Sequence, residues 1–466
     1  MSIEIRHITD NERNQELELR KYGFGDAPND EVEEADLKRM DPAEIIGAFE
    51  GGRLLAAAQA YRFSQMVRGV PKTCGGIAGV AAFPEARRRG LVRKVMNATL
   101  AELAEDGVAV SMLHPFKVSF YRSFGYITTD DTVVATYPPS AFASYLSHDG
   151  AKAAAVERYG PSDFSEAWAA FCELDTQSNG KAHGPILFSS IAPAQPSRRL
   201  DDRFVVLFQT PATGSADAGA AGNKRLDRAT GRPPSESAGR VVAGMVYRKE
   251  GGEPDGRLLV DYYRALPGFL PAVLRFVALH IDQCATARMP VAPMSTTNRL
   301  YARTGDIDGH VTPEPSRRPW MVRIVDVAAA LDGIPVLSEG EVTVAVTDEG
   351  GRWNTGVYTL RAGKKLTLTV ERADPGAAAA ADISLDQETL CRLLYGAADP
   401  MEILATTSPG APPTSERAAG AVAVKTGAVA ARSGSHGPPT STSRVEAVET
   451  LSTWFPERVF WNDWMF

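Results

Sequence analysis

The first part of the chain alternates between short apolar runs and polar turns, a pattern that predicts a meander of β-strands. Residues 3–8 alternate apolar and polar positions, which is typical of a half-buried strand. A helical spacing follows over residues 11–22. Glycine-containing turns then separate three further predicted strands, at 45–49, 54–61 and 74–83. Because consecutive strands joined by short turns usually pair, we expect an antiparallel meander here.

The last of these strands leads into a basic turn that opens a helix. The strand stops at Pro84, three arginines and a glycine occupy 87–90, and helical spacing runs over 91–103. The first N–H groups of a helix have no intrahelical partner, and together with the helix dipole they attract anions. A glycine lets the backbone approach a phosphate closely, and arginine donors match phosphate oxygens. The sequence therefore predicts a pyrophosphate site beside an extended strand, followed by a buried strand at 108–113.

Two further parts follow, and we predict domains at 1–150, 151–320 and 321–466. The middle part repeats the order of the first, with helices at 162–176 and 267–280 and strands at 204–208, 241–248, 258–263 and near Val291. Its segment 265–268 lacks the arginines, so we interpret it as a degenerate copy without cofactor. The third part has helices at 326–332, 386–395 and 444–453, and strands at 341–347, 356–361 and 365–371.

Two segments and the C-terminal tail stand apart from this pattern. Residues 211–239 and 406–443 are rich in Pro, Ala, Gly, Ser and Thr, and we expect a mobile surface insertion and a disordered stretch. Residues 453–466 contain three tryptophans and three phenylalanines. So apolar a tail is expected to be buried, which would hold the α-carboxylate of Phe466 in a fixed place, where it could accept a proton from an amine.

Composition narrows the class of protein. A chain of 466 residues is too long for one core and suggests about three domains. The net charge of −7 argues against a nucleic-acid binder and favours cationic substrates. The four cysteines have neither metal-ligand nor disulfide-framework spacing. With no signal peptide and no long apolar run, we expect a cytoplasmic protein without a metal and without a membrane partner.

The basic turn, R-R-R-G-L-V at 87–92, resembles the acetyl-CoA signature of the GNAT N-acetyltransferases, R/Q-x-x-G-x-G/A after a strand, with Val92 in place of the usual Gly or Ala. The run S-F-Y-R-S-F-G-Y at 119–126 resembles a second pattern of that family, F-Y-x-x-x-G-[FY]. The resemblance implies that Tyr121 lies beside the cofactor sulfur, where a phenol with a pKa of about 10 can protonate the departing thiolate. Tyr126 is expected to be a core aromatic.

The whole chain resembles the enhanced intracellular survival (Eis) family of acetyltransferases. The specific segments are V-A-A-F-P-E-A-R-R-R-G-L at 80–91, the aromatic run above, W-M-V-R-I-V-D at 320–326 and the aromatic C-terminus. This resemblance implies an α/β (α+β) fold class, with tandem GNAT acyltransferase folds followed by a sterol-carrier-like α+β domain. It implies Tyr121 as general acid and Phe466 as general base. It implies acetyl-CoA contacts at Val80, Ala81, Ala82, Arg88, Arg89, Gly90, Leu91, Val92, Arg93, Phe116 and Lys117.

The same resemblance implies acetylation of amines of aminoglycosides or similar polycations, at one or several positions, by a homohexamer built as a dimer of trimers. Asp26 and Asp463 are the acidic residues that we expect to line the substrate cleft. Two alternatives stay open from the residues alone. The acceptor could be a lysine of a protein or peptide, or the chain could be a lipid-binding protein with a vestigial GNAT domain. The intact basic turn and Tyr121 favour the enzyme.

Overall fold

The computed structural model divides the chain into two compact units. It describes residues 2–25, 37, 40–129, 133–152, 154–180, 182–187, 202–210, 239–291, 312–315, 319–373, 381–397, 399–405 and 441–458. The described residues of 1–129 and 318–460 form the first unit, and those of 130–317 form the second. The first unit therefore combines the first and the third parts predicted from the sequence.

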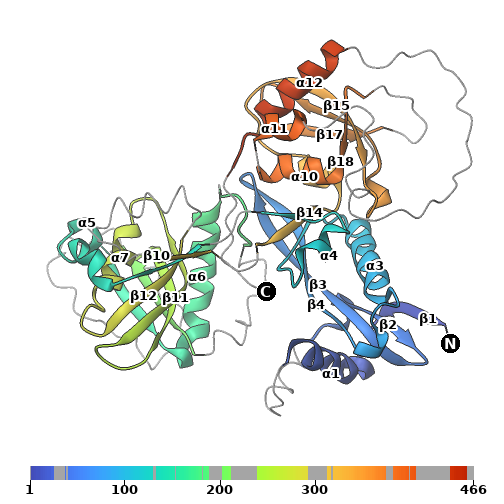
Figure 1. Cartoon of the computed structure of the whole chain (residues 1–466). Helices are drawn as coiled ribbons and strands as arrows, with labels where there is room; N and C mark the ends of the chain where they lie inside the picture. Colours follow the sequence, from blue (N-terminus) through green and yellow to red (C-terminus); the bar gives the residue numbers. More distant parts are fainter. Residues whose placement is uncertain are drawn as a thin grey trace, which may run out of the picture. The chain divides into compact units, whose positions relative to one another are not determined.

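A seven-stranded mixed sheet forms the N-terminal half of the first unit (Figure 1). Its order is β1-β2-β3-β4-β5-β14-β6, with β1 to β4 antiparallel and β5 parallel to β4. The predicted meander is therefore present. The strand bounds are Ile3–His7, Ile45–Glu50, Arg53–Val67, Val70–Ala82, Val110–Leu113, Met321–Ile324 for β14 and Ile127–Thr128 for β6.

Helices cover both faces of this sheet. Alanines on β3 alternate between the two faces, and their small side chains let a helix approach the sheet closely. Ala57 faces Leu17 and the rest of α1 (Arg13–Phe24), in one apolar cluster. Ala56 faces Val95 and the rest of α3 (Leu91–Glu105), in another. A short helix that the sequence pattern did not predict, α4 (Val118–Arg122), follows β5.

Strand β14 enters this sheet from far along the chain. We predicted that the third part begins at residue 321, but β14 pairs antiparallel with both β5 and β6. Met321, Val322 and Ile324 are completely buried, as the apolar pattern of a strand covered on both faces requires. The third part of the chain thus begins inside the sheet of the first.

The remainder of the first unit is a four-stranded sheet, ordered β17-β16-β15-β18, with helices beside it. Strand β18 and helix α11 were not predicted. The strands are β15 (Gly340–Thr347), β16 (Gly356–Ala362), β17 (Leu368–Arg372) and β18 (Ile383–Asp386). The helices are α9 (Val327–Leu331), α10 (Gln387–Tyr395), α11 (Pro400–Ala405) and α12 (Ser441–Trp454).

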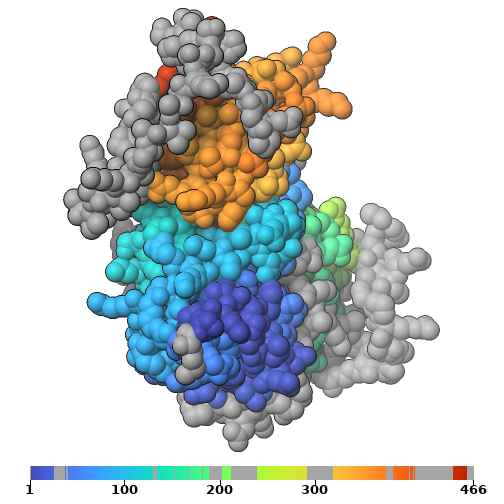
Figure 2. Space-filling model, turned by 90° about the vertical axis from the view of Figure 1, so that its right-hand side faces the viewer, coloured from blue at the N-terminus to red at the C-terminus, as the bar shows by residue number. Residues whose placement is uncertain are grey.

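The β3–β4 hairpin joins the two halves of the first unit and is longer than the sequence pattern predicted. Its end carries polar residues, which the pattern did not assign to strands, and these are buried against the C-terminal half. The Tyr395 hydroxyl donates a 2.8 Å hydrogen bond to Gln65, and Arg68 donates to the carbonyls of Leu393 and Leu394 at 2.7 Å. In Figure 2 the orange C-terminal half lies directly against the cyan and blue N-terminal half.

The second unit has its own seven-stranded sheet, ordered β13-β7-β12-β11-β10-β9-β8. Strand β7 lies within the range 1–150 assigned to the first domain, yet it pairs with β12 in this second sheet. The bounds are β7 (Val133–Tyr137), β8 (Ala155–Tyr159), β9 (Phe204–Gln209), β10 (Val241–Glu250), β11 (Gly256–Ala265), β12 (Cys284–Val291) and β13 (Thr312–Pro315), with helices α5 (Asp149–Lys152), α6 (Phe164–Asn179) and α7 (Leu270–Ala278).

Candidate active site

The site begins where β4 and β5 part from one another. The two parallel strands pair only from Cys74 to Gly76, opposite Val110 to Met112. Beyond Gly76, strand β4 continues to Ala82 and pairs with none of the described strands on its β5 side. Its backbone groups along that edge are therefore available to a ligand lying beside them. Val80, Ala81 and Ala82, which we predicted to contact acetyl-CoA, all lie on this edge.

A β-bulge distorts β4 within the same stretch. The register with β3 shifts between Ala57 and Gln59, so that Gly79 and Val80 together oppose one residue. Gly79 has φ +59°, a left-handed conformation that glycine adopts without strain. Bulges are common beside active sites, where they redirect backbone groups. Here the bulge turns the backbone just where the edge of β4 becomes free.

The turn between β4 and α3 presents unpaired backbone donors. The N–H groups of residues 88–93 make no hydrogen bond to any residue that the structure describes. Gly90 is the N-cap of α3 with φ +74°, and no atom lies within 4 Å of the place where a Cβ would stand. Helix α3 is long enough for its dipole to add to these donors. This arrangement fits a pyrophosphate group.

The arginines of the turn differ in what they contact. Arg89 forms an ion pair of 2.7 Å with Glu50 on β2, and Arg87 lies 3.4 Å from the carbonyl of Ala82. Arg88 is exposed and has φ +61°, which is unusual for a residue with a side chain. Arg93, one turn into α3, donates to Ser123 and lies 5.0 Å above the ring of Phe124. The exposed Arg88 is thus the best placed to meet an anion.

Tyr121 lies on α4 and is almost completely buried among aromatic rings. The rings of Phe116, Phe120 and Tyr126 surround it with edge-on geometry at 5.4, 5.0 and 6.2 Å. Burial raises the pKa of the Tyr121 hydroxyl well above its usual value of 10. The phenol therefore keeps its proton at neutral pH, as a general acid requires. Tyr126 instead shares a 2.7 Å hydrogen bond with Ser111 inside the core, in agreement with the expected core role.

A polar network that the sequence pattern did not predict lies on the α1 face and contacts the bulge. Gln59 accepts a hydrogen bond from Arg20 at 3.0 Å and donates one to Glu44 at 2.9 Å. A Cβ on Gly79 would lie 3.7 Å from the Cβ of Gln59 and 3.9 Å from Arg20. Burial raises the pKa of the Glu44 carboxyl. A single glutamine inside the apolar run 54–61 was the signal available in the sequence.

The other predicted site residues lie in different places. Leu91 is buried at the start of α3 and Val92 is half-buried, whereas Phe116 and Lys117 are exposed before α4. Asp26, Asp463 and Phe466 lie outside the described residues. Within the described ranges, no group of three His, Cys, Asp or Glu side chains is placed to hold a metal ion. None of the described helices is both long and apolar enough to cross a membrane.

In the second unit, a parallel pair again ends early. Strands β11 and β12 pair from Gly256 to Leu259. A pocket of about 200 Å³ lies beside the end of this pairing, lined by Val134, Arg248, Leu259, Val260, Asp261, Arg288 and Pro290. The segment 266–269 between β11 and α7 contains no arginine, unlike the turn between β4 and α3.

Comparison with known families assigns both halves of the first unit. Residues 4–129 match the acetyltransferase (GNAT) domain, and residues 327–408 match the sterol carrier protein domain. An uncharacterized N-acetyltransferase from Streptomyces griseus is 30% identical over 129 residues, which are 27% of this chain and 31% of that protein. The matched segment thus spans about a third of that relative.

Solved structures resemble the chain over its whole length. A GCN5-related N-acetyltransferase from Anabaena variabilis has a TM-score of 0.73 at 17% identity, with 100% of both chains covered. Eis1 from Mycobacterium abscessus has a TM-score of 0.63 at 16% identity, also with 100% of both chains covered. At such identities the likeness shows the fold. It confirms the predicted fold class: a mixed α/β chain with a GNAT domain, a sterol carrier protein domain and a full-length fold like that of Eis1.

Proposed function

We propose that this chain, with its GNAT and sterol carrier protein domains, transfers the acetyl group of acetyl-CoA to an amine of a small polycationic molecule of the aminoglycoside class. The observation that carries the proposal is the turn at 88–93. Its N–H groups, unpaired among the described residues, stand at the end of the β4 edge, which pairs there with none of the described strands. The N–H groups suit a nucleotide pyrophosphate, and an extended pantetheine arm can hydrogen-bond to the strand edge.

The residues present fit acetyl-CoA as the donor. The turn donors and the Arg88 side chain would hold the pyrophosphate, with Arg93 nearby on α3. The free edge of β4 at Val80, Ala81 and Ala82 would hold the pantetheine arm and the thioester. A backbone N–H at the bulge would polarise the thioester carbonyl as negative charge develops on its oxygen.

The reaction would be a direct transfer. The amine nitrogen, once deprotonated, attacks the thioester carbonyl and forms the new C–N bond. The C–S bond then breaks, and the departing thiolate takes the proton of the Tyr121 hydroxyl. The nitrogen loses a further proton as the amide forms, and by way of solvent that proton restores the Tyr121 hydroxyl. The α-carboxylate of Phe466 would accept the proton that the amine gives up. Cys74 is no candidate for an acyl-enzyme, because it is fully buried and burial raises the pKa of its thiol far above neutrality.

The choice of a cationic acceptor rests on charge. The chain has a net charge of −7, and the Glu44 side chain, bonded to Gln59, lies near the bulge on the α1 face. Asp26 and Asp463 would add to it. An aminoglycoside offers several ammonium groups, so acetylation at more than one position belongs to the proposal. So do a homohexamer arranged as a dimer of trimers and a cytoplasmic location.

The test is free-thiol release from acetyl-CoA with a panel of aminoglycosides, polyamines and lysine peptides. We expect turnover with aminoglycosides, and we expect it to be abolished when a few residues are added beyond Phe466. The same residues added before Met1 serve as the matched control and should leave turnover unchanged. Turnover with peptides alone would replace the substrate class. Turnover that survives the C-terminal extension would refute the role of Phe466 as the base. Absence of acetyl-CoA binding would refute the proposed acetyltransferase activity.

A further inference from the structure

We infer that the sterol carrier protein domain positions the general acid of the GNAT domain, through a buried Arg323–Asp348 ion pair that holds the turn after Tyr121. This inference rests on the role of Tyr121 in the proposed function. It gives the C-terminal half of the first unit a part in catalysis that is independent of any lipid. Arg323 and Asp348 are positioning residues, since neither is proposed to touch the substrate.

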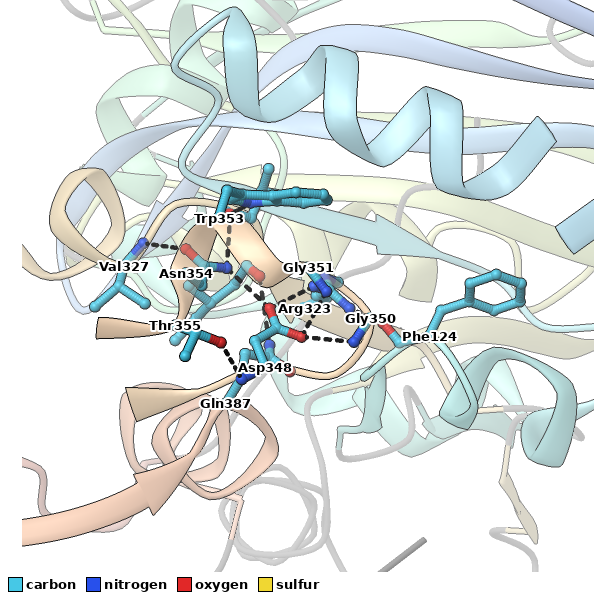
Figure 3. A network of polar contacts seen from close by, with 12 residues as sticks. Phe124, Arg323, Val327, Asp348, Gly350, Gly351, Trp353, Asn354, Thr355 and Gln387 are labelled. Atoms are coloured by element: carbon cyan, nitrogen blue, oxygen red, sulfur yellow. Dashed lines mark hydrogen bonds and ion pairs between the residues drawn. The ribbon is translucent and has the colours of Figure 1, made fainter. Parts of the chain in front are cut away.

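Arg323 reaches from the shared sheet to both halves of the first unit. It lies on β14 and its side chain is completely buried. One terminal nitrogen donates to the backbone carbonyl of Phe124, three residues after Tyr121. The other donates to Asp348 at 2.6 Å. Figure 3 shows the guanidinium between the Phe124 carbonyl and the Asp348 carboxylate.

Asp348 is itself fixed by its own half of the molecule. One carboxylate oxygen accepts from the N–H groups of Gly350 and Gly351 at 3.1 and 2.9 Å. The other accepts from the Asn354 amide at 3.0 Å in addition to Arg323. The carboxylate therefore cannot rotate without losing several hydrogen bonds. Because the guanidinium is planar, a fixed carboxylate also fixes the direction in which Arg323 points to Phe124.

The turn that Arg323 holds ends helix α4 directly after Tyr121. The Phe124 N–H donates to the Tyr121 carbonyl at 2.9 Å, and the Tyr126 N–H lies 3.4 Å from the same oxygen. Gly125, with φ +80°, leaves the space that Arg323 and Gln387 occupy. Arg93 of the phosphate-binding helix covers the ring of Phe124. Phe124 thus links the clamp, the Tyr121 turn and the acetyl-CoA turn.

Stability alone is a weak reason for such a pair. Two charges taken out of water regain little net free energy from their attraction, and apolar replacements of a buried pair are often as stable. What an apolar pair cannot supply is a directed hydrogen bond to the Phe124 carbonyl. Removing the pair as a pair should therefore leave the fold intact and release the turn.

The experiment compares Arg323→Met/Asp348→Leu with the wild type. We expect kcat for acetyl transfer to fall at least tenfold, while the Kd for acetyl-CoA changes little. The urea midpoint of unfolding should fall as well, because Asp348→Leu leaves the N–H groups of Gly350 and Gly351 without their acceptor. The matched control is Arg264→Met/Asp175→Leu, which removes another buried ion pair, of 2.5 Å, in the second unit. The control should keep the wild-type kcat. An unchanged kcat in the Arg323 variant, or an equal fall in the control, would overturn the inference.

Two further measurements keep the inference testable in every case. Should the double variant fail to fold, Arg323→Lys keeps a cation facing Asp348 but loses the planar fork, and kcat equal to wild type would refute the clamp. Amide hydrogen exchange at residues 121–126 reports on the turn without any acetyl transfer. Faster exchange there in the variant supports the clamp even where the wild type acetylates no amine in the panel. Unchanged exchange refutes it, so a wrong substrate class and a wrong clamp give different results.

Discussion

Arg89 and Glu50 are joined by two hydrogen bonds, of 2.7 and 3.2 Å, between the basic turn before α3 and strand β2. The Arg89 guanidinium lowers the pKa of the Glu50 carboxyl, so Glu50 stays ionised. A phosphate would have to compete with this carboxylate for Arg89. The exposed Arg88 has no such carboxylate partner among the described residues. The adjacent arginines therefore should not contribute equally to cofactor binding.

Replacing Arg88 by Ala should weaken acetyl-CoA binding more than replacing Arg89 by Ala. A charge-assisted hydrogen bond contributes about 1.5–3 kcal/mol, which corresponds to a rise in Kd of about tenfold or more for Arg88→Ala. For Arg89→Ala we expect a rise in Kd of less than about threefold. Arg89 is already paired with Glu50, so it contributes less to binding of the phosphate. Isothermal titration with acetyl-CoA measures both. A larger effect at Arg89 would show that Glu50 releases it when the cofactor binds.

Replacing Tyr121 by Phe should lower kcat by about a hundredfold, the lower end of what general acid catalysis contributes. The change removes only the hydroxyl from a buried ring, so the Kd for acetyl-CoA should stay within about twofold. Tyr126→Phe is the matched control, because its hydroxyl serves the core through Ser111. Steady-state kinetics of both variants measure the difference. Equal losses in the two variants would mean that the effect is structural, and Tyr121 would lose its role.

Local patterns in the sequence were sufficient to predict the strand, turn and helix on which the proposed acetyl-CoA site depends. A strand, arginines, a glycine and a helix are adjacent along the chain, and the structure has β4, Gly90 and α3 in that order. The meander β1 to β4 was predictable for the same reason, because its turns are short. The Tyr121 turn was found through its motif, although the helix that carries it was not.

The remaining parts depend on contacts between distant segments. Strand β14 pairs with β5 across about two hundred residues, and no local pattern specifies such a partner. The burial of Arg323 could not be predicted from the sequence either, since an arginine in a strand is usually exposed. The end of the β3–β4 hairpin looked like a loop because Gln65 and Arg68 are polar. Both are buried only because the C-terminal half supplies hydrogen-bond partners.

The folded chain should lose stability as pH rises above about 10. Burial raises the pKa of Tyr121 and Tyr126 above 10, the value near which both phenols ionise in the unfolded chain. Above that pH the unfolded state binds fewer protons than the folded state, so the free energy of unfolding falls, by up to about 1.4 kcal/mol per pH unit for each tyrosine. Urea unfolding at pH 9 and pH 11 measures the fall. Tyr126→Phe should show a smaller fall than the wild type, and equal slopes would contradict the assignment.

Replacing Gly125 by Ala should destabilise the protein much more than replacing Gly107 by Ala. Both glycines have positive φ, +80° and +69°, so both changes carry a backbone cost of about 1 kcal/mol. A Cβ on Gly107 meets nothing within 4 Å, whereas one on Gly125 would lie 2.6 Å from Gln387 and 2.7 Å from Arg323. Crowding adds about 1–3 kcal/mol and pushes Arg323 away from Phe124. Urea unfolding measures the difference in the free energy of unfolding between the two variants. Equal losses would mean that Arg323 and Gln387 move aside without cost.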